Sequence, residues 1–231
     1  MANGAAFFDV DGTLVGKHIV HQYIFLRQRM LPSFVRPLWT AAFYAFKGPV
    51  YKIVDKISRT RLNIMFYRNY AGLRASEVRA NVKDCFENIL RPCIFEAGRD
   101  CIAEHRSKGR RIVFVTGSID FIIEPLARHL DADSVLAPTL IERDGRFTGE
   151  LDGPPVGEAE KARRIREYAE RENLDLSESF AYGDSIADLP MLEQVGHPGV
   201  VNPDRPLSMT AGKMGWPTYH WTVRNGSTQA Q

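Results

Sequence analysis

Residues 5–14 of the chain read Ala5-Ala6-Phe7-Phe8-Asp9-Val10-Asp11-Gly12-Thr13-Leu14, a short apolar run that ends in two carboxylates. Such a run predicts a buried parallel strand, and open α/β folds bind ligands at the carboxyl ends of their strands. Side chains two residues apart on a strand share one face, where two carboxylates repel unless a cation or a shared proton lies between them. Asp9 and Asp11 are therefore candidate site residues, and a divalent metal fits there.

A plainer interpretation gives this stretch no function. Asp-Gly is common in turns, so Asp11 and Gly12 could simply end a strand. That interpretation leaves Asp9 unexplained. Because five fixed positions match by chance in many chains, the rest of the sequence has to decide between the two.

The stretch Asp9-Val10-Asp11-Gly12-Thr13-Leu14 resembles the first motif of the haloacid dehalogenase-like superfamily, whose phosphatases use the first Asp as a nucleophile. The resemblance is to subfamily IB, the phosphoserine-phosphatase-like branch with a helical C1-type cap. It predicts three further motifs in a fixed order, each at a strand end or a helix start.

The second motif is matched by Thr116-Gly117-Ser118, which follows the β-branched apolar run 110–115. A hydroxyl followed by Gly at a strand-to-helix junction offers a side-chain donor and free backbone N–H groups, which suit a phosphate. Thr-Gly-Ser is also common turn chemistry, so this match is weak when it is taken alone.

The third motif of the family is a Lys at the start of a helix, and Lys161 lies in the first turn of a charged helix predicted over 157–173. The helix dipole disfavours a cation there, which favours a specific use of Lys161, but the local sequence alone favours one more solvated lysine beside Arg163 and Arg164. The fourth motif is matched after the strand 179–182 by Gly183-Asp184-Ser185 and by Asp188. These two acids add carboxylates to the edge that carries Asp9.

The order of strands and helices predicts an α/β fold with a doubly wound, mainly parallel Rossmann-like sheet, a β-hairpin flap at 140–150 and an all-helical cap inserted after the first strand. Residues 1–16 and 96–231 form the predicted haloacid dehalogenase-like catalytic core, and residues 17–95 form the predicted cap. We expect cap helices over 18–30, from 33 into 46, over 51–70 and over 76–90, the last opened by Ser76 as its N-cap.

The cap and the core differ in charge. Residues 17–95 hold 14 Lys and Arg against 4 Asp and Glu, a net charge of +10, whereas the remainder has a net charge of −8. The basic cap predicts either an anionic partner or a solvated helical surface. Because aromatic and basic residues alternate in it, a peripheral membrane contact is a further hypothesis beside that of a buried cap helix.

Other classes of protein are disfavoured. The chain has no Walker or dinucleotide loop and no Cys/His metal cluster, and no nucleic-acid partner is expected. The three cysteines form no CxxC pair and are expected to be small buried hydrophobes. The N-terminal residues do not resemble a signal peptide, so we expect a cytoplasmic protein.

The resemblance implies a mechanism with a role for each motif. Asp9 attacks phosphorus and becomes an aspartyl phosphate, while Asp11 moves the protons. Mg²⁺ is held by Asp9, by the backbone carbonyl of Asp11 and by Asp184, and Asp188 is a further ligand or orients the others. The phosphoryl group is bound by the side chains and amides of Gly12, Thr116, Gly117, Ser118 and Lys161.

Two departures from the phosphoserine phosphatases bear on the substrate. His18 stands where those enzymes carry a Glu that receives the substrate amine, and Ser185 replaces a Gly. We therefore expect a phosphomonoester other than phosphoserine, with a lipid or other anionic phosphate first and a sugar or polyol phosphate second. A phosphotransferase with the same intermediate, and a membrane-surface binding module with a vestigial site, are the remaining hypotheses.

Overall fold

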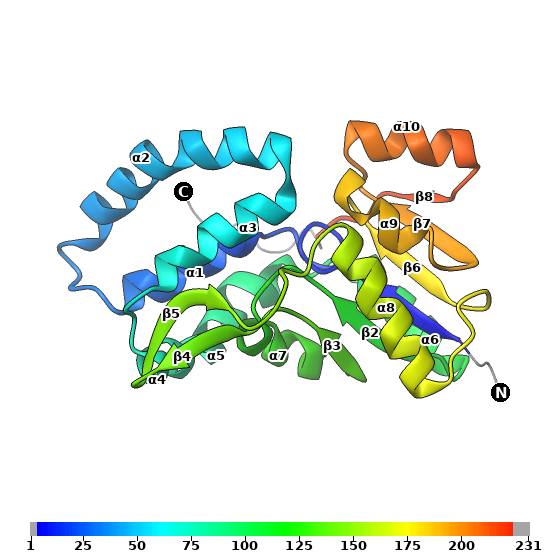
Figure 1. Ribbon diagram of the computed structural model, residues 1–231, viewed down its shortest axis with the longest axis horizontal. Helices are drawn as coiled ribbons and strands as arrows, with labels where there is room; N and C mark the ends of the chain where they lie inside the picture. The colour runs from blue at the N-terminus through cyan, green and yellow to red at the C-terminus, as the bar shows by residue number, and fades with distance from the viewer. Residues whose placement is uncertain (1–3, 224–231) are drawn as a thin grey trace.

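Six parallel strands form one central sheet in the computed structural model, which describes residues 4–223. In space the strands follow the order β3-β2-β1-β6-β7-β8 (Figure 1). Their bounds are β1 (Ala5–Phe8), β2 (Arg111–Val115), β3 (Ser134–Leu136), β6 (Phe180–Gly183), β7 (His197–Val201) and β8 (Thr218–Tyr219). The strand order reverses between β1 and β6, and the crevice at such a reversal is where open α/β sheets bind ligands. The predicted α/β class and doubly wound sheet are confirmed.

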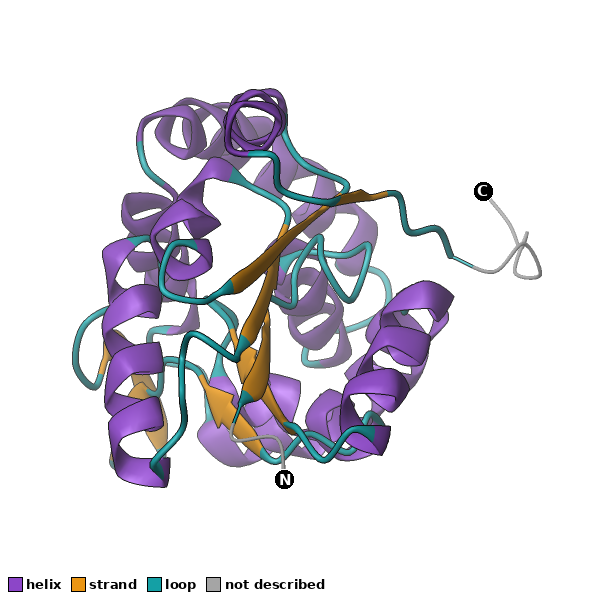
Figure 2. Cartoon of the chain, turned by 90° about the vertical axis from the view of Figure 1, so that its right-hand side faces the viewer, coloured by secondary structure: helices purple, strands orange, loops and turns teal. Residues whose placement is uncertain are grey.

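Both faces of the sheet are covered by helices, as Figure 2 shows. Successive residues of β1 point to opposite sides, so that Phe8 packs in one core cluster and Phe7 in another. The Phe8 side is covered by α6 (Glu96–Ser107) and α7 (Asp120–His129), and the Phe7 side by α8 (Ala159–Glu172), α9 (Leu189–Leu192) and α10 (Arg205–Met214). This double burial explains why β1 is an unbroken apolar run.

The region predicted as the cap is helical. Its helices are α1 (Ile19–Arg29), α2 (Arg36–Ile57), α3 (Arg59–Tyr67), α4 (Ala75–Ala80) and α5 (Val82–Cys85). No helix among residues 4–223 has the length and apolar content needed to span a bilayer. The insertion of helices after β1 agrees with the predicted architecture, while the residue boundaries of the two domains stay a prediction.

Three helix boundaries in the cap were wrongly predicted. The helix expected over 51–70 is interrupted at Ser58, between α2 and α3. The break expected after Phe46 does not occur, because α2 continues through Gly48 and Pro49. Phe43 and Tyr51 lie eight residues apart, on the same side of α2, and both are buried in the cap core. Packing on both sides of the proline thus offsets the backbone hydrogen bond that it removes.

The helix expected over 76–90 is instead broken into α4, α5 and a π-helical turn at Phe86–Leu90. Ser76 is not its N-cap, because α4 begins at Ala75 and Arg74 occupies the cap position. The N–H of Ala75 donates to the carbonyl of Gly145 in the hairpin, at 2.9 Å. A contact from a distant part of the chain therefore fixes the start of this helix.

The predicted flap is confirmed as an antiparallel hairpin of β4 (Leu140–Arg143) and β5 (Arg146–Leu151). It lies beside the cap helices (Figure 1) and contributes Leu140 and Phe147 to the cap core. The ring of Phe147 stacks on that of Phe121 in α7, with centroids 5.4 Å apart. The hairpin thus joins the cap to the core rather than standing free.

The sequence reasoning did not predict the last helix and strand of the chain. The start of α10 carries an ordinary signal, because Asp204 caps it by accepting the N–H of Leu207 at 2.8 Å. Its end is also marked, since Gly215 takes a left-handed φ of 68° there. These two residues could have revealed the helix.

Candidate active site

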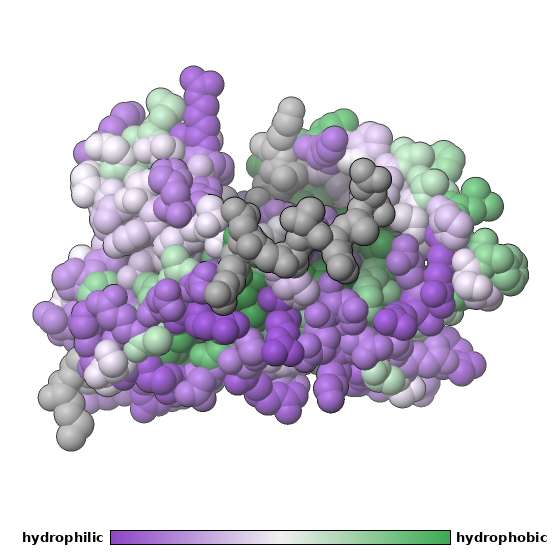
Figure 3. All heavy atoms as spheres, turned by 180° about the vertical axis from the view of Figure 1, so that it is seen from behind, coloured by the Kyte–Doolittle hydropathy of each residue, from purple (hydrophilic) through white to green (hydrophobic). Residues whose placement is uncertain are grey.

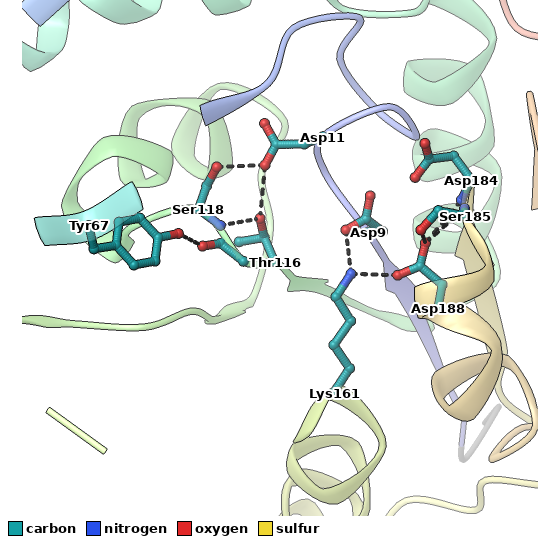
Figure 4. Close-up of polar contacts among 10 residues, drawn as sticks. Asp9, Asp11, Tyr67, Thr116, Ser118, Lys161, Asp184, Ser185 and Asp188 are labelled. Carbon is teal, nitrogen blue, oxygen red and sulfur yellow. Dashed lines mark hydrogen bonds and ion pairs between the residues drawn. The ribbon is translucent and has the colours of Figure 1, made fainter. Parts of the chain in front are cut away.

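Three neighbouring strands bring the motif residues to one edge of the sheet. Asp9 follows β1, Thr116 follows β2 and Asp184 follows β6, and β1 lies between the other two. The backbone continues the ladder one step past the strand, because the N–H of Asp9 donates to the carbonyl of Tyr182 at 2.9 Å. The parallel register therefore places the ends of all three motifs side by side (Figure 4).

Lys161 lies between two buried carboxylates. Its Nζ donates to Oδ1 of Asp9 at 2.5 Å and to Oδ1 of Asp188 at 2.6 Å. All three side chains are at most 7% exposed. Burial alone lowers the pKa of Lys161, but the charges of Asp188 and Asp9 outweigh it and raise that pKa above its ordinary value. The ammonium group in the first turn of α8 is thus held by the acids it faces.

Asp9 is more strongly perturbed than an ordinary carboxyl group. Burial raises its pKa to about 6, although the charge of Lys161 acts in the opposite direction. Its second oxygen, Oδ2, is buried and has no hydrogen-bond partner in the described part of the chain. A buried carboxylate oxygen without a donor is costly unless a ligand or a cation completes its surroundings. Asp9 therefore has a bare oxygen where a reacting atom or a metal could lie.

Carboxylate oxygens of Asp9, Asp184 and Asp188 come within 4.8 Å of one another. Gly12 makes this approach possible, because a Cβ at that position would lie 2.2 Å from Oδ2 of Asp184. The φ of Gly12 is 102°, a value that favours glycine. A set of oxygen ligands with several negative charges suits a hard divalent cation. The described residues thus fit the metal expected from the sequence.

Asp188 is largely occupied by other contacts. Besides the ion pair with Lys161, its Oδ2 accepts the N–H groups of Asp184 and Ser185 at 3.1 and 3.2 Å. These bonds hold the loop that presents Asp184. Of the two roles that the sequence left open for Asp188, the contacts favour the orienting one.

The Asp11 carboxylate turns away from the acidic cluster, toward Ser118 and the cap (Figure 4). It accepts from Oγ of Ser118 at 2.5 Å and from Oγ1 of Thr116 at 3.4 Å. Its other oxygen accepts from Nε2 of Gln22 on α1 at 3.1 Å. The sequence predicts Asp9 and Asp11 on one face of a strand. The first strand ends at Phe8, however, so the alternation of a pleated strand does not extend to these two residues.

The turn after β2 is built as a small cradle. The N–H of Ser118 donates to Oγ1 of Thr116 at 3.0 Å, which fixes the threonine hydroxyl within the turn. Tyr67 of α3 donates its hydroxyl to the carbonyl of Gly117, and the amide of Asn63 lies directly against the same glycine. A side chain at position 117 would collide with Asn63, because a Cβ there would lie 2.5 Å from Nδ2.

The cap closes over a cavity of about 50 Å³ at this edge. The core lines it with Asp9, Asp11, Gly117, Lys161 and Asp184, among others, and the cap adds His18, Ile19 and Asn63. A further contact joins cap and core at the rim, where Oγ of Ser58 donates to Oε1 of Glu158 at 3.0 Å. Of the predicted phosphate-binding residues, Gly117 and Lys161 line the cavity, whereas Thr116 and Ser118 lie behind it in contact with Asp11.

Sequence reasoning singled out His18 but missed three other residues that the cap contributes to the site. Gln22, Asn63 and Tyr67 are at most 4% exposed, and all three contact the motif residues. Only Gln22 left a signal, as a polar residue within the apolar stripe of α1. Asn63 and Tyr67 reach the site through the packing of α3, which no local pattern encodes.

Comparison with known proteins places the chain in a family. The model of the haloacid dehalogenase-like hydrolase family matches residues 6–193. A probable phosphatase of Mycobacterium tuberculosis is 38% identical over 220 residues, which cover 94% of this chain and 75% of the relative.

Solved structures share the fold. A protein of unknown function from Bordetella pertussis matches with a TM-score of 0.78 and 23% identity, over 95% of this chain and 99% of that one. A phospho-aspartyl intermediate analogue of phosphoserine phosphatase matches with a TM-score of 0.66 and 20% identity, over 95% and 94% of the two chains. At these identities the likeness concerns the fold alone.

Proposed function

Because the chain belongs to the haloacid dehalogenase-like hydrolases and is a phosphatase, we propose that it hydrolyses a small phosphomonoester through an aspartyl phosphate formed on Asp9. One observation carries the proposal. Asp9 is a buried carboxylate that lines the cavity, with one oxygen fixed by Lys161 and the other without a donor among the described residues. Such a group is positioned to attack a phosphorus atom in the cavity.

In the first step an oxygen of Asp9 forms a bond to phosphorus, and the bond from phosphorus to the alcohol oxygen of the substrate breaks. The alcohol leaves with a proton from Asp11. In the second step a water molecule attacks the same phosphorus, Asp11 takes its proton, and the carboxylate of Asp9 is released with inorganic phosphate. Each step needs one group that moves a proton beside the cavity, and Asp11 is a residue of its lining.

Gln22 and Ser118 position Asp11 for this work. Both donate to its carboxylate, one to each oxygen, and Ser118 is in turn within 3.4 Å of Oε1 of Gln22. These contacts hold the Asp11 carboxylate in one orientation between the turn after β2 and α1, and Asp11 lines the cavity from there.

Lys161 and Gly117 are proposed to receive the phosphoryl oxygens. The ammonium group offers positive charge beside the attacking carboxylate, and the amide of Gly117 lies in a turn whose threonine hydroxyl is already fixed. Thr116 and Ser118 then act on the phosphate through that turn, and Gly12 lets the backbone pass close to Asp184.

Mg²⁺ is the metal we propose for the acidic cluster. It would be held by the carboxylates of Asp9 and Asp184 and by the carbonyl oxygen of Asp11, with Asp188 orienting the loop. When bound, it would offset the repulsion between the acids and the phosphoryl oxygens.

The cavity favours a small substrate. Its volume of about 50 Å³ in this structure leaves no room for an acyl chain beside a phosphoryl group. We therefore propose a sugar, polyol or similar small phosphate, the second of the two substrate classes derived from the sequence, in place of a lipid phosphate. His18 at the cavity wall still argues against the amine of phosphoserine.

A phosphate-release screen tests the proposal. The full chain is assayed with Mg²⁺ against small phosphomonoesters, with and without an added alcohol, and the protein is quenched in acid to trap a phosphoenzyme. We expect release that stops with a chelator and returns with Mg²⁺. Transfer of phosphate to the alcohol would instead indicate a phosphotransferase. Turnover that is indifferent to chelation, or the absence of any turnover across the panel, would contradict the proposal.

A further inference from the structure

The outer side of α2 is apolar and uncovered. Exposed large hydrophobic residues lie along it and in the turn before it, with exposed fractions from 45% to 82%: Phe34, Leu38, Phe46, Val50, Ile53 and Ile57. We name these six residues the α2 face. In Figure 3 hydrophobic residues gather on the same end of the molecule. Patches of this kind mark contact surfaces, whereas single exposed hydrophobic residues need no explanation.

The spacing shows that this is one continuous stripe. From Leu38 the residues follow at intervals of eight, four, three and four, which returns to the same side of a helix each time. The side of α2 that packs inward carries a different set, in which Phe43 and Tyr51 are buried in the cap core. The α2 face is therefore surplus to the packing of the described fold.

The charged residues in this part of the chain are almost all basic. Between Gly12 and Ser76 the chain holds 11 Lys and Arg and a single acidic residue, Asp55. Lys47 and Lys52 on α2 itself form no ion pair with any side chain that the structure describes. At a membrane surface, anionic lipid headgroups attract basic residues while the interface takes up apolar ones.

From these observations we infer that α2 lies in the interface of an anionic bilayer, with the α2 face toward the acyl chains and its lysines at the headgroups. A second copy of the chain fits less well, because two such faces would bring their positive charges together. The helix lies on the bilayer and does not span it, since no helix in the described range is long and apolar enough to cross.

The proposed contact lies next to the catalytic cavity. Immediately after α2, Ser58 donates to Glu158, which lines the cavity wall. The inference is independent of the proposed chemistry, since a protein without phosphatase activity could carry the same surface. Binding and turnover can therefore be measured separately on the same preparation.

Vesicle co-sedimentation of the full chain tests the inference. The vesicles are phosphatidylcholine alone or phosphatidylcholine with about one third phosphatidylglycerol, a fraction chosen to give a surface potential at least that of a cell membrane. We expect binding only to the anionic vesicles and its loss at high salt. Equal binding to both kinds of vesicle, or to neither at low salt, would overturn the inference.

Variants locate the contact. Phe46→Ser with Ile53→Ser should lower vesicle affinity about tenfold or more, and Lys47→Gln with Lys52→Gln about thirtyfold. The control is Met209→Ser with Met214→Ser on α10, whose side chains are also more than half exposed, and it should bind as the parent does. Hydrolysis of a small chromogenic phosphate should stay unchanged in all three.

Unchanged vesicle binding in both α2 variants would overturn the inference. So would a dimer in light scattering that Phe46→Ser dissociates, since the face would then belong to a second copy. Circular dichroism of each variant separates these outcomes from a failure to fold.

Discussion

The catalytic edge, which is the edge of the sheet that carries Asp9, Thr116 and Asp184, differs from the cap in where its charged and apolar side chains lie. At the edge, charged groups are buried and paired across elements that lie far apart in the sequence, as with Lys161, Asp9 and Asp188. On the cap, charges are mostly solvated and apolar side chains such as Phe46 are exposed. The groups at the edge are therefore held by electrostatic pairing in a buried site, whereas apolar side chains on the outer side of the cap stay exposed.

This difference separates chemistry from recognition. In the proposed mechanism, groups at the edge touch the phosphoryl group that all substrates share, so changes there should lower turnover of every phosphomonoester alike. The cap would then contact the part of the substrate that varies, so changes there should alter the ranking of substrates. Substitutions on both sides of the cavity test this separation.

The largest effect is expected from Asp9→Asn. An amide of nearly the same shape is a poor nucleophile and cannot form the acyl phosphate, so kcat should fall by about 10⁴-fold or more. Phosphate release and acid-quench trapping measure the loss. The matched control is Asp175→Asn, at an exposed position away from the site. Full turnover in Asp9→Asn would refute the proposed mechanism.

Lys161→Met should follow, with a loss of about 10²- to 10³-fold in kcat, because charge stabilisation next to the nucleophile is removed. It also leaves Asp9 and Asp188 buried without their shared partner, a change that costs about 3–5 kcal/mol of unfolding free energy. Denaturant unfolding measures that cost.

Arg163→Met is the control for Lys161→Met, two residues further along α8, since its side chain is 44% exposed. Its ion pairs with Glu160 and Glu167 lie at the surface, where such pairs contribute little. Similar losses of stability in the two variants would show that the buried pairing is not what distinguishes the edge.

The sequence predicted the edge well, for a physical reason. A strand end is a local feature, and parallel pairing brings strand ends together, so Asp9, Thr116 and Asp184 could be placed from three short segments. Lys161 was assigned from the third motif of the family, and its place in the first turn of α8, where a cation is disfavoured, only supported that assignment. Each of these signals lies within a few residues of the side chain concerned.

The cap was predicted only in outline. Its helical character follows from apolar spacing, but the bounds of α2 and α4 depend on packing against partners distant in sequence. Asn63 reaches the cavity because α3 packs beside the turn after β2, and no pattern around Asn63 indicates this. The contact is tertiary, so a local reading could not supply it.

The third prediction concerns a residue of the core that lies away from the edge. Burial, aided by the charge of Arg110, lowers the pKa of His105 to about 4 from 6.5. The unfolded chain therefore binds a proton that the folded chain does not, and stability should fall as the pH drops from 6.5 toward 4, by up to about 3 kcal/mol. Above pH 7 the group contributes no pH dependence.

His105→Gln should flatten that part of the stability profile, which denaturant unfolding across the pH range measures. The exposed His220→Gln serves as control and should leave the profile unchanged. Turnover at neutral pH should be the same in both variants. A profile as steep in His105→Gln as in the parent would place the acid sensitivity elsewhere, with His21, whose pKa is also lowered by burial, as the next group to examine.

The smallest effect, and the one that tests the cap itself, is expected from Asn63→Ala. The side chain is buried and lines the cavity, and its amide has no hydrogen-bond partner among the described residues, which leaves it for the substrate. For a phosphomonoester whose alcohol carries further hydroxyl groups, kcat/KM should fall about tenfold, the value of one hydrogen bond. For an aryl phosphate without such groups the loss should be much smaller. Asn81→Ala, in the same cap but outside the cavity lining, should change the turnover of neither substrate. An equal fall in kcat/KM for both substrates in Asn63→Ala would indicate that the amide contacts the phosphoryl group. In that case a residue of the cap would take part in the step proposed for the edge, and the proposed separation of chemistry from recognition would be wrong for Asn63.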